Sequence, residues 1–116
     1  PDGKQVISSS NDGTVKFWLV ESGTEVSSIE GNIAEISSMA ISSNGKQLVS
    51  GSWDDVSLWD IENGKQLLNI SGDSATVSRV TYSPDGNLIA YTNSDSITYN
   101  SIQILDLATG QITKNI

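Results

Sequence analysis

The chain has no cysteine and no histidine among its 116 residues. Without cysteine it has no disulfides, no thiolate metal sites and no cysteine nucleophile. Without histidine it lacks the usual general base and the side chain found in most zinc sites. It also lacks a Gly-rich phosphate loop and a Gly-x-Ser-x-Gly motif. We therefore expect a protein that is not an enzyme, with no catalytic residue and no cofactor.

Basic residues and long apolar runs are scarce too. The chain has six Lys and Arg residues and fourteen Asp and Glu residues, which gives a net charge of −8. This charge repels phosphate backbones and favours basic partners, so we expect no nucleic-acid binding. No apolar run approaches the ~20 residues that span a bilayer, so we expect no membrane insertion. The sequence leaves open whether a targeting segment lies upstream of Pro1. From these residues we expect a cytoplasmic protein.

Acidic turns do not have the spacing of a metal site. Asp54 and Asp55 are adjacent, whereas a calcium loop needs several alternating oxygen ligands and a distal Glu. We therefore expect plain turns and no metal. Asn69-Ile70-Ser71 is a glycosylation sequon, but it lies at the end of an expected strand.

The sequence repeats with a fixed period. Trp18 and Trp59 are 41 residues apart, and Gly23 and Gly64 have the same offset. Three similar turns follow one another at steps of 42 and 41 residues: Pro1-Asp2-Gly3, Ser43-Asn44-Gly45 and Pro84-Asp85-Gly86. Such a period indicates one supersecondary unit used repeatedly. Repeats of this kind usually present a surface to partners.

Each unit reads as four short strands joined by tight turns. Gly45, Gly64 and Gly86 follow Asn or Asp, a pair that favours hairpin turns. No segment shows a helical apolar stripe, so we expect about eleven strands and almost no helix. The expected strands that can be assigned by pattern are residues 24–29, 36–41, 48–52, 56–59, 65–70, 77–82, 88–92, 102–105 and 111–116.

Three segments, in this order along the chain, resemble segments of WD-repeat proteins: Ile41-Ser42-Ser43-Asn44-Gly45, Val49-Ser50-Gly51-Ser52 and Leu58-Trp59-Asp60. The third unit has Leu105-Asp106 in place of Trp-Asp and is similar to TolB-type propeller repeats. Four strands per ~40 residues match a propeller blade. We therefore expect an all-β partial β-propeller of about three four-stranded antiparallel blades, the first without its innermost strand. The blades would span residues 1–32, 33–74 and 75–116 of one domain.

The resemblance implies that Trp18 and Trp59 anchor the third strand of their blades and are buried equivalently. The family's Gly-His pair is replaced by Gly31-Asn32 and Gly72-Asp73, so its Asp-His-Ser-Trp hydrogen-bond relay cannot form in full. The two indoles would still donate to a strand hydroxyl such as Ser8 or Ser50.

Propellers close with four to eight blades, so three are too few. We expect a fragment of a longer propeller that needs neighbouring blades, and self-association of copies is the alternative.

The WD-repeat arrangement would bring second-to-third-strand loops and inter-blade links to one face. That face carries six carboxylates and no Lys or Arg, which favours a basic protein partner, although Asp is also a common turn residue. Its candidate residues are Asn11, Asp12, Glu30, Asn32, Trp53, Asp54, Asp55, Asp73 and Asp95.

Two aromatic residues stand out on this face. An exposed Trp53 would be a binding hot spot, but packing against the neighbouring blade is the alternative that we favour. Unit three lengthens the corresponding loop within residues 94–101, and Tyr99 in it is a candidate contact unless the insertion is neutral variation.

We therefore expect a non-catalytic protein-interaction scaffold. One alternative is the sensor part of a larger signalling enzyme, an NTPase or kinase, whose catalytic motifs would lie outside these residues. Another is a TolB-like envelope propeller.

Overall fold

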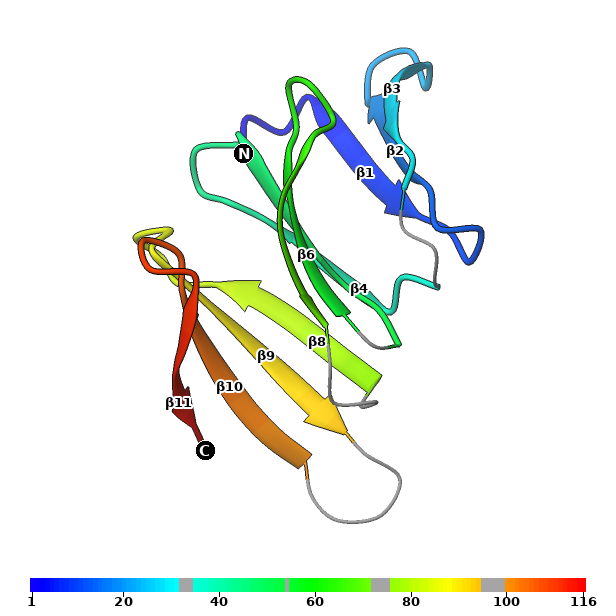
Figure 1. The fold of residues 1–116 in the computed structure, drawn as a ribbon. Helices are drawn as coiled ribbons and strands as arrows, with labels where there is room; N and C mark the ends of the chain where they lie inside the picture. Colours follow the sequence, from blue (N-terminus) through cyan, green and yellow to red (C-terminus); the bar gives the residue numbers. More distant parts are fainter. Residues whose placement is uncertain (32–34, 54, 72–75, 95–99) are drawn as a thin grey trace.

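The computed structural model describes residues 1–31, 35–53, 55–71, 76–94 and 100–116 (Figure 1). These residues form eleven β-strands and no helix, which confirms the all-β class. Sheet 1 contains β1 (Gln5–Ser9), β2 (Val15–Leu19) and β3 (Glu25–Ile29). Sheet 2 contains β4 (Ser38–Ile41), β5 (Gln47–Gly51), β6 (Asp55–Asp60) and β7 (Gln66–Ser71). Sheet 3 contains β8 (Thr76–Tyr82), β9 (Leu88–Ser94), β10 (Asn100–Asp106) and β11 (Gln111–Asn115).

The three sheets lie side by side like blades of a partial propeller (Figure 1). Strands follow chain order within each sheet, and all pairs are antiparallel. The first strands of sheets 2 and 3, β4 and β8, lie next to each other. By register, β1 corresponds to β5 and β9, because Val6 pairs with Trp18 as Leu48 pairs with Trp59. Within the described residues, sheet 1 therefore has no counterpart of β4 or β8.

The repeat extends to an irregularity in strand pairing. Each sheet shifts register between its last two strands, at the residue that corresponds to Trp59 by strand register. The shifts fall between Phe17 and Trp18, Leu58 and Trp59, and Ile104 and Leu105. The same bulge in three sheets shows that one supersecondary unit is built three times.

Two apolar clusters join the sheets. The cluster between sheets 1 and 2 contains Val15, Phe17, Ile29, Ile36, Leu48 and Trp59. The cluster between sheets 2 and 3 contains Val49, Val56, Leu58, Val77, Val80, Ile89, Tyr91 and Leu105. Alternate residues of β5 and β6 enter different clusters, because successive side chains of a strand point to opposite faces. Both faces of sheet 2 are thus covered.

Hairpin turns have the backbone that the sequence predicts. Gly45, Gly64 and Gly86 have φ of 72°, 67° and 75°, a left-handed region that glycine enters without steric cost. In the first of these turns, the Asn44 side-chain oxygen accepts a 3.0 Å hydrogen bond from the Lys46 amide. The Asn side chain therefore holds the turn that brings β4 into β5.

The expected strand at residues 36–41 starts later, at Ser38. Ile36 instead lies in the core between sheets 1 and 2 with 7% of its surface exposed. The Ser37 hydroxyl donates to the carbonyls of Gly51 and Val77, and the Ser37 amide donates to the Gly51 carbonyl at 2.9 Å. Ser37 is thus held both by Gly51 of sheet 2 and by Val77 of sheet 3, and the sequence pattern could not show the second contact because it lies between sheets.

Equivalent burial of Trp18 and Trp59 is wrong. Trp59 is 3% exposed between sheets 1 and 2, whereas Trp18 is half-buried on the outer face of sheet 1. Their strand partners differ in the same way, since Leu48 is 0% exposed and Val6 is 54% exposed. Trp18 faces the side of sheet 1 opposite to sheet 2, where none of the described sheets packs on it.

Candidate functional site

One end of the three sheets collects the β1–β2 and β5–β6 turns and the links that lead from sheet to sheet. It runs along the lower right of Figure 1. We call it the top rim, and its described residues are 10–14, 30–31, 35–37, 52–53, 71, 76 and 94. The bottom rim at the other end consists of the turns at residues 2–4, 20–24, 43–46, 61–65, 83–87 and 107–110.

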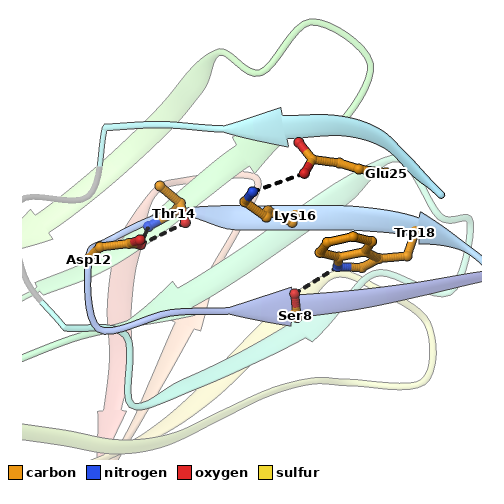
Figure 2. Close-up of polar contacts among 6 residues, drawn as sticks. All are labelled: Ser8, Asp12, Thr14, Lys16, Trp18 and Glu25. Atoms are coloured by element: carbon orange, nitrogen blue, oxygen red, sulfur yellow. Dashed lines mark hydrogen bonds and ion pairs between the residues drawn. The ribbon is translucent and has the colours of Figure 1, made fainter. Parts of the chain in front are cut away.

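Asp12 lies in the top-rim turn of sheet 1. Its carboxylate accepts hydrogen bonds from the Thr14 hydroxyl at 2.7 Å and the Thr14 amide at 2.9 Å (Figure 2). The hydroxyl and then the amide of Thr14 hold the pKa of Asp12 below its ordinary value of 3.8. Asp12 is therefore ionised at neutral pH, and because its side chain is also exposed it provides a fixed surface charge.

The outer face of sheet 1 carries a polar group next to the top rim (Figure 2), and Lys16 of this group is attracted to Asp12 and Glu30. Lys16 Nζ is 2.9 Å from a carboxylate oxygen of Glu25, and the ammonium lies 5.7 Å from the centre of the Trp18 ring. The Trp18 indole donates a 2.9 Å hydrogen bond to Ser8 Oγ. An exposed ion pair stabilises a fold little, so these contacts chiefly organise the surface around Trp18.

Trp59 forms the corresponding bond inside the molecule. Its indole donates at 3.0 Å to Ser50 Oγ, and both residues are buried. The two serines are the acceptors that the repeat positions indicate.

Asp55 is engaged within sheet 2. It is half-buried at the start of β6, and its carboxylate accepts hydrogen bonds from Ser52 Oγ, from Ser57 Oγ at 3.4 Å and from Asn69 Nδ2 at 2.8 Å. The Asn69 amide nitrogen also donates to Ser57 Oγ at 2.9 Å. Asp55 thus ties β6 to β7, and the nitrogen that a glycan would need is already bonded.

Trp53 is not packed against a neighbouring blade, and this corrects the interpretation favoured from the sequence. With 73% of its surface exposed, it is the most exposed of the large apolar side chains in the described residues. It lines a hollow of about 350 Å³ together with Glu35, Ser37 and Thr76, at the junction of sheets 2 and 3.

Glu35 is a site residue that the sequence analysis missed. It is exposed in the link before β4, in the same kind of segment as Glu30, which is also exposed and follows β3. The signal that was missed is its place in the repeat, because Glu35, like Glu30, lies in the link between sheets 1 and 2.

The other candidates, Asn32, Asp54, Asp73, Asp95 and Tyr99, lie outside the described residues, as does most of the lengthened loop of unit three. In the part of the chain that the structure describes, no three His, Cys, Asp or Glu residues gather as a metal site would require. The same residues include no helix long and apolar enough to cross a bilayer.

The two rims differ in charge. The described top-rim residues include Asp12, Glu30 and Glu35 and no Lys or Arg. The bottom rim mixes both signs, with Asp2, Lys4, Glu21, Lys46, Glu62, Lys65 and Asp85. A second hollow of about 300 Å³ lies toward the bottom rim between sheets 1 and 2, lined in part by Phe17, Ile41 and Ile61.

A family model described as WD domain, G-beta repeat (WD40) matches residues 1–18, 23–60 and 64–98. The second match joins β3 of sheet 1 to β4–β6 of sheet 2, and the third contains β7 and then β8 and β9. The sequence repeat is thus offset by one strand from the sheet. Repeats of this family are generally protein-interaction scaffolds, and proteins built from them are typically non-catalytic. Matches over most of its length, with three blade-like sheets, show that the chain belongs to the WD40 family.

Proposed function

We propose that this chain is a non-catalytic scaffold within a larger propeller, and that its top rim binds a basic protein segment. The observation that carries the proposal is the charge difference between the rims. Every charged side chain among the described top-rim residues is acidic, while the bottom rim mixes both signs. Carboxylates of one sign on one face steer a basic partner toward it and orient it there.

The local structure supports this role. The Thr14 hydrogen bonds keep Asp12 ionised and fixed, so its charge does not need to be ordered when a partner binds. Glu30 and Glu35 are exposed beside the links between sheets, where a partner can reach two sheets at once. Asp55 supports the fold of the rim through its bonds to Ser52 and Asn69.

The proposal is tested by titrating the chain with a lysine-rich peptide that has serine spacers, at rising salt. We expect affinity to fall as salt rises, because the charges involved are exposed and screened. Asp12→Asn and Glu30→Gln should each weaken binding about two- to fivefold, the size of an exposed charge contact.

The matched controls are Glu21→Gln and Glu62→Gln, which remove the same charge from the bottom rim. They should leave the affinity unchanged. Equal losses from the two rims, or binding that ignores salt, would contradict the proposal.

A further inference from the structure

Trp53 is displayed at the top rim by a short hairpin. The Ser52 amide donates to the Asp55 carbonyl at 2.9 Å, which closes the β5–β6 turn around Trp53. The equivalent turn of sheet 1 is one residue longer, and there the Ser10 amide donates to the Thr14 carbonyl at 3.0 Å. The shorter turn places a large apolar ring where the first turn has small polar residues. An indole that is 73% exposed costs solvation energy unless a partner covers it.

The hollow beside Trp53 is fixed by hydrogen bonds within sheet 2 and between sheets 2 and 3. Ser37 donates to the Gly51 and Val77 carbonyls, and the Val77 amide donates to the Ser52 carbonyl at 3.0 Å. Trp53 follows Ser52 in the chain, and Thr76 precedes Val77. The two sides of the hollow are therefore next to backbone groups that are hydrogen-bonded to each other. A preformed site loses little conformational entropy on binding.

The lining has the chemistry of a cation site. Among the described lining residues, Glu35 carries the charge, the Ser37 and Thr76 hydroxyls offer acceptor oxygens, and Trp53 offers an aromatic face. None of the four described residues that line it is basic. An aromatic face attracts a cation, and a carboxylate beside it adds a charge-assisted hydrogen bond.

We propose that this hollow binds one arginine side chain of the partner, with the guanidinium stacked on Trp53 and paired with Glu35. This inference rests on the proposed function, because it names the residue type by which a basic segment is recognised. A volume of about 350 Å³ suits a single side chain, since ligand pockets start at about 300 Å³. Arginine fits better than lysine because its planar group stacks on a single ring and donates in a fork to a carboxylate.

The test uses the full chain and three serine-spaced peptides that differ in one residue type: arginine, lysine or neutral citrulline. The chain has three tryptophans, so NMR of the indole N–H groups reports separately on Trp18, Trp53 and Trp59. The arginine peptide should shift the Trp53 indole signal and leave the buried Trp59 signal in place. The lysine peptide should bind more weakly, and the citrulline peptide should not bind.

Substitutions then locate the contact. Trp53→Ala should weaken arginine-peptide binding about tenfold, the size of a partly desolvated cation–π contact, while Trp53→Phe keeps most of it. Glu35→Gln should weaken binding, whereas Glu21→Gln, with the same charge change on the bottom rim, should not. An unchanged Trp59 signal shows that each variant is folded.

The failures are distinct. Salt-dependent binding that is lost in the Asp12 and Glu30 variants but unaffected by Trp53→Ala would overturn this inference and leave the proposed function standing. A shift confined to the Trp18 indole, or equal binding of lysine and arginine peptides, would also overturn it. Absence of binding by both basic peptides would overturn the inference and the proposed function together.

Discussion

Trp18 and Trp59 occupy the same place in consecutive repeats, but their surroundings differ. The two side chains should therefore contribute differently to the free energy of unfolding. Each indole donates to a serine on the neighbouring strand, at 2.9 Å from Trp18 and 3.0 Å from Trp59. Trp59 is also enclosed by Val15, Phe17 and Leu48, whereas Trp18 is half-buried beside Lys16. The hydrogen bond belongs to the repeat unit, while the burial depends on the adjacent sheet.

Trp59→Ala should therefore lower the free energy of unfolding by about 3–5 kcal/mol, the usual cost of truncating a large aromatic core residue. Trp18→Ala should cost less than half as much, because solvent already covers part of the indole. Trp53→Ala, at a site 73% exposed, is the control and should change stability by about 0.5 kcal/mol or less. Urea unfolding followed by circular dichroism measures all three. Similar losses at Trp18 and Trp59 would show that burial does not decide the difference.

At the scale of the element, sheet 3 fills the core positions of Trp59 and Ser50 with different residues. Trp59 and Ser50 of sheet 2 correspond by register to Leu105 and Tyr91 of sheet 3. The smaller side chain on β10 is matched by a larger one on β9, and the Tyr91 hydroxyl donates to Gln103 Oε1 at 2.6 Å. All four residues are buried. The paired exchange fills a similar volume and explains how the third unit departs from Trp-Asp without losing the blade.

Sheet 3 packs tightly against Gly51 of β5. A Cβ atom there would lie 2.5 Å from Val77 Cγ1 and 2.9 Å from Val80 Cγ1. Gly51→Ala should therefore destabilise the chain by about 1–3 kcal/mol, the usual cost of overpacking a core. The measurement is again urea unfolding.

A double-mutant cycle with Val77→Ala is the control. The double variant should lose less stability than the sum of the two single losses, because removing the Val77 methyl groups makes room for the new Cβ. Strict additivity would show that the clash is not the cause.

The sequence predicts the strands, turns and anchors of each element because these follow from residues close together in the chain. Gly45 and Gly86 mark turns, and the repeat position of Trp59 indicates its serine acceptor. It does not predict features that depend on contacts between sheets. The Ser37 hydroxyl donates to Val77 of sheet 3, and Thr76 of sheet 3 lines one hollow with Glu35 and Trp53. The sequence therefore does not predict the top-rim hollow, because its lining residues come together only when the sheets pack.

At the scale of the whole molecule, the two end sheets each leave one face uncovered by the described residues. Ile102 of β10 is 43% exposed, while Val56, at the corresponding position of β6, is 3% exposed. Val6 and Leu48 differ in the same way at the other end of the molecule. The inner edge of β1 also offers backbone groups that the described strands do not pair. Exposed apolar faces and open strand edges favour association with further blades.

The isolated 116-residue chain should therefore form species larger than its monomer mass of 12.3 kDa in sedimentation, whereas a chain extended by neighbouring repeats should sediment as a monomer of its own mass. Because the driving force is apolar and the net charge of −8 opposes it, association should strengthen as salt rises. This sign is opposite to that expected for binding at the top rim, so the two events can be told apart. Val6→Lys and Ile102→Lys, on the two open faces, should weaken association. Leu67→Lys, on the outer strand of sheet 2 at 45% exposure, is the matched control and should not. A monomer at all salt concentrations, or equal effects of the three substitutions, would show that the open faces do not drive association.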